Sequence, residues 1–391
     1  MENIPFLLLA GFILCVFFLV SFTSEKLRLP SVLIYIILGL AVSSYFVDSH
    51  AIHTVAEIGI VLLFFILGLE FPMARMLDIS KRVWPAGFMD VALNLVGAML
   101  IGLLFGLDFI SAFILGSVAY ATSSSISAKM LEEKKRLANP EAEFILALLI
   151  FEDLVAPILV SFIASIQGGQ EITAPFMLLL LAKILFLLLG AIIIGHFGFK
   201  KLNQFVAKHI QKDFMPLLAV GIALGYAGVA IQLGLSEVLG AFLAGVMLSE
   251  TGRASELEHL LVPIRHLTLP FFFFWFGTSI DLGQGVPFLG MLLVLLIWAL
   301  LGKSCTAYWG GRLFGLTRKV SCRAAFSMVQ RGEFSAIIAS LAAPQLRIFS
   351  GIYILITAII GVLLFNKAPA IANWYHDKWC KKCALEEAEA K

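Results

Sequence analysis

Apolar runs long enough to cross a lipid bilayer recur along the sequence from Phe6 to Ile371, with only short polar stretches between them. A run of about 18 or more apolar residues is typical of a transmembrane helix. The composition agrees, because 60% of the 391 residues are hydrophobic and 14% are charged, against about 45–50% and about 25% in soluble domains. The sequence therefore predicts an all-α polytopic membrane protein. It excludes a soluble enzyme and a β-barrel, whose strands would alternate between apolar and polar residues.

The polar interruptions divide the apolar runs into about thirteen expected transmembrane helices. These cover residues 4–23, 31–47, 54–72, 83–104, 109–130, 142–166, 174–199, 213–232, 236–250, 258–280, 286–311, 320–345 and 348–370. An offset of seven helices pairs the first six with the last six, and the members of each pair then run in opposite directions. The count therefore predicts two inverted-topology repeats, an architecture common among secondary transporters. After a transmembrane domain of residues 1–371, residues 372–391 are expected to form a short tail that cannot fold alone.

Lys and Arg residues are distributed unevenly among the expected loops. If the N-terminus lies outside the cell, 24 of the 28 Lys and Arg residues fall in cytoplasmic loops or in the C-terminal tail. Such residues concentrate on the cytoplasmic side of membrane proteins. We therefore expect a multi-pass plasma membrane protein with its N-terminus outside and its C-terminus in the cytoplasm. The formal net charge of +2 is too small to indicate nucleic-acid binding.

Two adjacent carboxylates, Glu152 and Asp153, lie in the middle of the expected helix at 142–166. An ionisable group at membrane depth costs at least about 2.5–3.5 kcal/mol on insertion scales, so it is a candidate functional residue. Neighbouring side chains on a helix project about 100° apart, so one carboxylate can line a cavity while the other contacts another helix. A partly dry carboxylate can hold a proton at neutral pH and bind a cation once the proton leaves. This competition is the minimal chemistry of cation/proton exchange; the alternative is a buried ion pair between helices.

Four consecutive hydroxyl residues, Thr122, Ser123, Ser124 and Ser125, lie one helix earlier. Such side chains compete with the backbone for hydrogen bonds and lower helix propensity, so the pattern predicts a break at mid-depth. The freed carbonyl and hydroxyl oxygens are suitable ligands for an alkali cation. The alternative is a small-residue face that packs against another helix.

A second candidate break lies seven helices after the first, where Gly332 is flanked by Arg331 and Glu333. We expect the two charged side chains to neutralise each other or the ends of the two half-helices. Their main role is then architectural, and direct cation binding is the less favoured interpretation.

Lys303 lies deep in the expected helix at 286–311. A lysine at this depth must be neutral, extend to the membrane surface or find an anion, and Asp153 or Glu152 is the expected partner. A Lys–Asp bridge that opens when a cation takes the carboxylate would link cation binding to the proton of the lysine.

Other polar residues in the expected helices are less specific. Lys183 has no companion motif and is expected to extend to the membrane surface or to pack. Asp90 and Asn94 share one helix face, and they either enter the site or connect its helices. No nucleotide motif or metal-ligand cluster appears in the loops, so we expect no cofactor besides the transported ions.

Six motifs together resemble the monovalent cation:proton antiporter-2 family, and within it the KhtU-like and Kef-like potassium/proton antiporters. They are Phe65-Ile66-Leu67-Gly68-Leu69-Glu70, Thr122-Ser123-Ser124-Ser125, Glu152-Asp153, Gly277-Thr278-Ser279-Ile280-Asp281, Gly302-Lys303 and Arg331-Gly332-Glu333-Phe334. The resemblance covers nearly all of the chain, and it rests on several motifs in the same order.

The resemblance implies that Asp153 is the ion- and proton-binding carboxylate, beside a crossed, unwound helix at residues 122–125. Lys303 matches the basic residue that approaches this aspartate, while Arg331 and Glu333 match the second unwound helix. The resemblance also implies a homodimer in which a core domain moves as an elevator against a dimerisation domain. The core would comprise residues 83–166 and 286–370, the dimerisation domain residues 4–72 and 213–280, and a linker helix residues 174–199.

The expected function is therefore exchange of K⁺, with Na⁺ as the alternative ion, for protons by alternating access. The Glu152-Asp153 pair matches KhtU-like proteins and favours electroneutral exchange. A cation channel is the alternative function, whereas the intact carboxylates and Lys303 disfavour an inactive accessory subunit. The expected partners are membrane lipid, a second copy of the chain, and a separate cytosolic regulatory subunit in place of the missing Kef-type nucleotide-binding domain.

Overall fold

The computed structural model describes residues 6–27, 30–43, 50–69, 73–167, 174–195, 214–249, 253–280, 285 and 287–389. The regular secondary structure of these residues is entirely helical. In this part of the chain, eight helices are long and apolar enough to cross a membrane, and four apolar helices are shorter. The all-α membrane fold is confirmed, whereas the count of thirteen spans stays a prediction.

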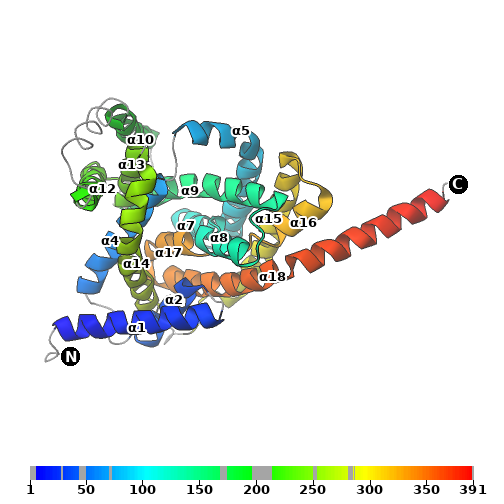
Figure 1. Ribbon diagram of the computed structural model, residues 1–391, viewed down its shortest axis with the longest axis horizontal. Helices are drawn as coiled ribbons and strands as arrows, with labels where there is room; N and C mark the ends of the chain where they lie inside the picture. Colours follow the sequence, from blue (N-terminus) through cyan, green and yellow to red (C-terminus); the bar gives the residue numbers. More distant parts are fainter. Residues whose placement is uncertain are drawn as a thin grey trace. The chain divides into compact units, whose positions relative to one another are not determined.

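The chain folds into two compact units, each made of two separate stretches of sequence (Figure 1). Unit 1 comprises residues 1–71 and 181–284, and unit 2 comprises residues 72–180 and 285–391. The helices of unit 1 are α1 (Phe6–Leu27), α2 (Ser31–Ala41), α4 (His50–Leu69), α12 (Met215–Gln232), α13 (Glu237–Ser249) and α14 (Ala254–Thr278). Helix α10 (Ala174–Ile193) runs across the boundary.

Unit 2 contains the polar residues that the sequence singles out. Its helices are α5 (Met73–Asp90), η1 (Val91–Val96), α6 (Gly97–Leu104), α7 (Phe109–Tyr120), α8 (Ser124–Glu133), α9 (Pro140–Gln167), α15 (Leu289–Phe314), α16 (Arg318–Ala325), α17 (Glu333–Ser340) and α18 (Pro344–Glu389). Helix α7 packs against α6, η1 and α17, and α15 packs against α5 and α16.

Unit 1 is held together by close contacts between helix backbones. Gly68 of α4 lies against the backbone of Phe242 and Gly245 in α13, and Gly245 lies against Phe65 in return. A Cβ atom at either glycine would overlap a carbonyl oxygen of the other helix. Small residues let membrane helices approach this closely.

Some residues of the expected motifs and helices lie outside the described residues. These are Glu70 and Asp281 of the family motifs and residues 196–199 of the expected linker helix.

Unit 2 contains both of the helix breaks that the sequence predicts. Helix α7 ends at Tyr120 and α8 begins at Ser124, whereas α16 ends at Ala325 and α17 begins at Glu333. The first break is shifted from its expected position, because Ser124 and Ser125 already belong to the first turn of α8. The inverted repeat itself stays a prediction.

The two breaks lie against each other. The backbone N–H of Ser123 donates to the carbonyl oxygen of Gln330 at 2.9 Å. Gly332 faces Ser123 so closely that a Cβ atom at position 332 would overlap the serine side chain. On the other side, a Cβ atom at Gly361 of α18 would lie 2.5 Å from the backbone nitrogen of Gln330. The crossing therefore depends on glycine at both positions.

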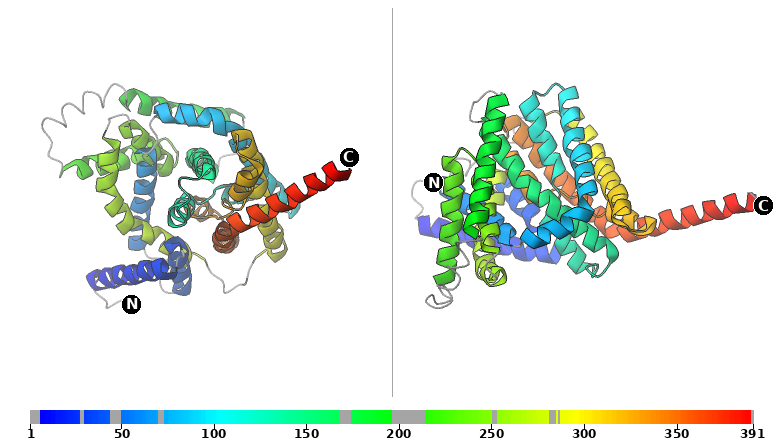
Figure 2. Two further views of the ribbon diagram at one scale, coloured as in Figure 1. Left: turned by 45° about the vertical axis from the view of Figure 1, so that its right-hand side comes forward. Right: turned by 90° about the horizontal axis from the view of Figure 1, so that it is seen from above.

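Helix α18 is 46 residues long and includes Pro369. Residues 372–389 of the expected tail are therefore a continuation of this helix. In both views of Figure 2 this part of α18 extends beyond the other helices of unit 2.

Candidate functional site

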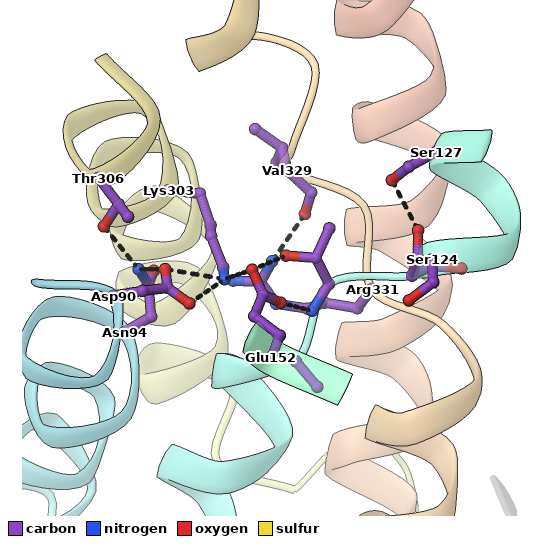
Figure 3. A network of polar contacts seen from close by, with 12 residues as sticks. Asp90, Asn94, Ser124, Ser127, Glu152, Lys303, Thr306, Val329 and Arg331 are labelled. Carbon is purple, nitrogen blue, oxygen red and sulfur yellow. Dashed lines mark hydrogen bonds and ion pairs between the residues drawn. The ribbon is translucent and has the colours of Figure 1, made fainter. Parts of the chain in front are cut away.

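The residues expected to form the site come together inside unit 2, around the two helix breaks. Thr122 and Ser123 lie in the first break, Glu152 and Asp153 in the middle of α9, and Lys303 in α15. Figure 3 shows the polar contacts that connect several of these side chains with residues of η1 and of the second break.

Glu152 supports the first helix break. Its carboxylate accepts a hydrogen bond from the backbone N–H of Thr122 at 2.5 Å and from Thr122 Oγ1 at 3.1 Å. The side chain is 1% exposed. The backbone N–H that the break frees from helical hydrogen bonding is therefore satisfied by a carboxylate of α9, as buried polar groups require.

Lys303 contacts two carboxylates. Its Nζ lies 2.9 and 2.8 Å from the two carboxylate oxygens of Asp90 and 3.0 Å from Glu152 Oε1 (Figure 3). All three side chains are buried. Of the two anions expected for Lys303, Glu152 is a partner, and Asp90 is a partner that the motifs did not indicate.

Asp90 is positioned by a neighbouring polar pair. Asn94 Nδ2 donates to Asp90 Oδ1 at 2.8 Å and to Thr306 Oγ1 of α15 at 3.1 Å. Asp90 is the last residue of α5, and Asn94 belongs to the π-helical turn η1. Such turns are often found at functional sites. The spacing of Asp90 and Asn94 indicates that both residues lie on one helix face near the site, but it does not identify Lys303 as the partner of Asp90.

Asp153 has different partners from its neighbour Glu152. Ser124 Oγ, in the first turn of α8, lies 2.7 and 2.8 Å from the two carboxylate oxygens of Asp153. Asp153 is 4% exposed, whereas Ser124 is half-buried and Ser125 is exposed. The Asp153–Ser124 pair therefore lies near the accessible side of the first break, while Glu152 lies in the buried ionic network.

Glu333 is the first residue of α17, and its carboxylate contacts the first turn of α8. Its carboxylate accepts hydrogen bonds from Ser123 Oγ at 2.6 Å, from the backbone N–H of Ser125 at 3.0 Å and from Ser125 Oγ at 2.7 Å. A carboxylate at a helix N-terminus also interacts favourably with the helix dipole. Glu333 therefore stabilises the end of a half-helix, which is one of the two roles expected for it.

Arg331 is fully buried in the second break. Its Nη1 donates to the carbonyl oxygen of Val329 at 3.1 Å, whereas Nε and Nη2 lack a hydrogen-bond partner among the described residues. No ion pair joins Arg331 to Glu333 in this part of the structure. Mutual neutralisation of these two residues, the other expected role, is therefore not found.

The buried charges around the breaks do not balance. The cluster has two cationic side chains, Lys303 and Arg331, and four buried carboxylates, which are Asp90, Glu152, Asp153 and Glu333. If all six are ionised, the cluster has a net charge of −2. An excess of buried charge of one sign is costly. The cluster is therefore suited to take up protons or cations, and the Asp153–Ser124 pair offers oxygen ligands at its accessible side.

A second buried ionic cluster connects α9 with α16, and the sequence analysis did not predict it. Glu141 of α9 is fully buried between Arg136 and Arg323. Arg136 Nε donates to Glu141 Oε1 at 3.2 Å, and its Nη2 donates to Ser327 Oγ at 3.0 Å. These contacts join the end of α16 to the start of α9. They therefore stabilise the helix that leads into the second break.

The sequence and the fold are similar to those of known membrane transporters. The family model "sodium/hydrogen exchanger, transmembrane" matches residues 12–368. Two structures of the sodium proton antiporter MjNhaP1 from Methanocaldococcus jannaschii share the fold, with TM-scores of 0.68 and 0.70 at 18% and 17% identity. They align with 93% and 94% of this chain and with 96% and 98% of their own chains.

Curated relatives are similar over most of their length. The ammonium/H⁺ antiporter subunit AmhT of Alkalihalophilus pseudofirmus is 50% identical over 378 residues, which are 97% of each chain. The K⁺/H⁺ antiporter subunit KhtU of Bacillus subtilis is 30% identical over 90% of each chain. The probable Na⁺/H⁺ antiporter GerT of Bacillus cereus is 30% identical over 81% of this chain and 85% of its own. The K⁺-specific subtype is therefore not established by similarity.

These matches, together with the helix breaks and the buried carboxylates, show a secondary transporter rather than an enzyme. The chain belongs to the sodium/hydrogen exchanger transmembrane family, and it is a multi-pass cation/proton antiporter.

Proposed function

We propose that this antiporter exchanges a monovalent cation of the size of K⁺ or NH₄⁺ for protons, and that the two ions occupy Asp153 in turn. The observation that carries the proposal is the Asp153–Ser124 pair, at the accessible side of a cluster that has four buried carboxylates and two cationic side chains. A proton and a cation cannot occupy one carboxylate together. This exclusion couples the two fluxes by alternating access, without a separate gate for each ion.

The oxygen ligands near Asp153 support both K⁺ and NH₄⁺. The Asp153 carboxylate and Ser124 Oγ can coordinate an alkali cation through lone pairs, and the same oxygens can accept N–H hydrogen bonds from ammonium. Relatives named for ammonium, K⁺ and Na⁺ transport are all similar to this chain, and the ammonium antiporter subunit has the highest identity of the three. The transported cation is therefore K⁺, as expected from the motifs, or NH₄⁺, with Na⁺ as the alternative.

The assembly is part of the same proposal. We propose a homodimer in the plasma membrane, with the N-terminus outside, in which unit 2 moves as the elevator and unit 1 forms the dimer. The names of AmhT and KhtU describe them as subunits. This supports a separate cytosolic regulatory subunit for this chain as well.

Exchange by purified protein in liposomes tests the proposal. With a trapped pH-sensitive dye, addition of K⁺ or NH₄⁺ to wild-type protein should move protons, and Asp153→Asn should abolish this movement. Asp108→Asn is a matched control, because Asp108 is an exposed carboxylate before α7. Normal cation-dependent proton movement in Asp153→Asn would refute Asp153 as the shared site.

The same liposomes separate an antiporter from a channel. A channel would pass the cation down its gradient without compulsory proton movement. An antiporter should instead build up a proton gradient when only the cation gradient is imposed and the pH is initially equal on both sides.

A further inference from the structure

We infer that Asp90 is the positioning residue that holds Lys303 in place as a fixed counter-charge, so that Lys303 does not exchange partners with Asp153 during transport. The inference rests on the proposed role of Asp153 as the shared ion site. It adds a residue that the site motifs do not contain, and it determines how much charge each cycle moves.

The geometry leaves Lys303 without a free donor for Asp153. A lysine ammonium group has three N–H donors. The two oxygens of Asp90, at 2.9 and 2.8 Å, and Glu152 Oε1, at 3.0 Å, account for three contacts. Glu152 is in turn fixed by the backbone N–H of Thr122. A move of Lys303 to Asp153 would break contacts with two buried carboxylates at once.

Asp90 is in turn held by contacts between the η1 turn and helix α15. Asn94 connects Asp90 to Thr306, which lies one helical turn after Lys303 on α15. A Cβ atom at Gly302 would lie 2.7 Å from Asn94 Oδ1, so the helices approach closely at this point. Trp298 Nε1 also donates to the carbonyl oxygen of Leu93 at 2.9 Å. Helix α15 and the η1 turn are therefore joined on both sides of Lys303, and Figure 3 shows the Asn94–Thr306 contact on one of these sides.

This arrangement predicts the charge balance of transport. If Lys303 keeps its charge and its partners, the only ion exchange occurs at Asp153, where one proton replaces one monovalent cation. The cycle then moves no net charge. A Lys303 that released its own proton in each cycle would instead add a second proton to the exchange and make it electrogenic.

Two single variants and their combination test the role of Asp90. Lys303→Gln changes the net charge of the group Asp90, Glu152 and Lys303 by −1, Asp90→Asn changes it by +1, and the double variant restores it. Each single variant should lower the maximal exchange rate in liposomes by at least about tenfold, because it changes the net charge of this buried group and removes contacts between Lys303 and Asp90. The double variant should recover at least about tenfold over Lys303→Gln, as expected for directly coupled residues, with an unchanged KM for the cation.

The outcome that overturns the inference is a double variant as inactive as Lys303→Gln, because Lys303 would then act beyond its pairing with Asp90. Lys183→Gln is the matched control, since Lys183 lies in the apolar helix α10 and outside the network, and it should exchange like wild type.

Charge movement by wild-type protein tests the inference even if the variants do not fold. Current recorded on a solid-supported membrane after a cation jump should show no net charge transfer, although the dye assay reports exchange. A steady transport current would overturn the fixed role of Lys303. Failure of the proposed function is distinguishable, because Asp153→Asn would then exchange normally whatever the result at Asp90.

Discussion

The backbone N–H of Ser123 donates to the carbonyl oxygen of Gln330, so the two broken helices are joined by a direct main-chain hydrogen bond of 2.9 Å. A second contact strengthens the crossing, because Ser335 Oγ of α17 donates to the carbonyl oxygens of Val118 and Ala121, near the end of α7, at 2.8 and 3.0 Å. Each break therefore satisfies backbone groups of the other. The Asp153–Ser124 pair depends on this crossing, because Ser124 begins the half-helix that follows the first break.

Gly332→Ala should damage both stability and exchange. The new Cβ atom would overlap the side chain of Ser123, and overpacking of this kind costs about 1–3 kcal/mol. The thermal unfolding midpoint in detergent should fall, and the liposome exchange rate should fall further. Gly221→Ala is the control, since Gly221 of α12 has no atom within 4 Å of the position of a Cβ. Equal behaviour of the two variants would contradict the close crossing.

Replacement of Glu333 should destabilise the start of α8. Glu333→Ala leaves the backbone N–H of Ser125 without its acceptor and also removes the acceptor of two hydroxyl groups. The contact between the Ser125 N–H and Glu333 is part-buried, and a hydrogen bond to a charged group contributes about 1.5–3 kcal/mol. Glu333→Gln keeps one acceptor oxygen, so its unfolding midpoint should lie between those of wild type and Glu333→Ala. If Glu333→Gln is as unstable as Glu333→Ala, the charge rather than the hydrogen bonds matters.

Local sequence signals predict the two breaks but not their limits. A run of hydroxyl residues and a glycine between opposite charges are each sufficient to interrupt an apolar helix. The exact start of α8 could not be predicted in this way. Glu333 accepts a hydrogen bond from Ser125 and so stabilises the helix from Ser124 onward. That acceptor lies 208 residues away in the sequence, so local propensity alone could not reveal it.

The partner of Lys303 could not be derived from the sequence for the same reason. Lys303 and Asp90 are 213 residues apart, and several buried carboxylates were available as partners. The choice depends on the π-helical turn η1, which follows Asp90 directly. Its sequence, Val-Ala-Leu-Asn-Leu-Val, has no feature that distinguishes a π-helix from an α-helix. The position of the charged residues within the apolar helices could be predicted from the sequence, whereas their partners could be identified only from the packed structure.

The N-terminal cap of α7 should give a small pH-dependent contribution to stability. Asp108 Oδ2 accepts from the backbone N–H groups of Ile110 and Ser111 at 3.1 Å. Hydrogen bonds from Ser111, more than any other cause, lower the pKa of Asp108. A lowered pKa means stabilisation that is present above the pKa of the unfolded chain, about 3.9, and that is lost as the pH falls through the folded value.

Two substitutions separate the cap from its charge. Asp108→Ala should cost about 0.5–2 kcal/mol at neutral pH, as for other N-caps, and the difference from wild type should shrink below about pH 4. Asp108→Asn retains a capping oxygen, so it should stay close to wild type at neutral pH. Unfolding midpoints measured across the pH range check both. A pH-independent difference for Asp108→Ala would show that the carboxylate charge contributes nothing.

Glu141 should be among the most sensitive positions for stability outside the ion site. Glu141→Gln leaves the guanidinium groups of Arg136 and Arg323 without their carboxylate. Removing one member of a buried ion pair costs about 3–5 kcal/mol, so the unfolding midpoint should fall steeply. Glu143→Gln, two residues later, is the matched control, because Glu143 and its partner Arg82 are 69% and 63% exposed. An exposed pair contributes about 0–1 kcal/mol, and similar losses at the two positions would show that Glu141 does not hold α16 against α9.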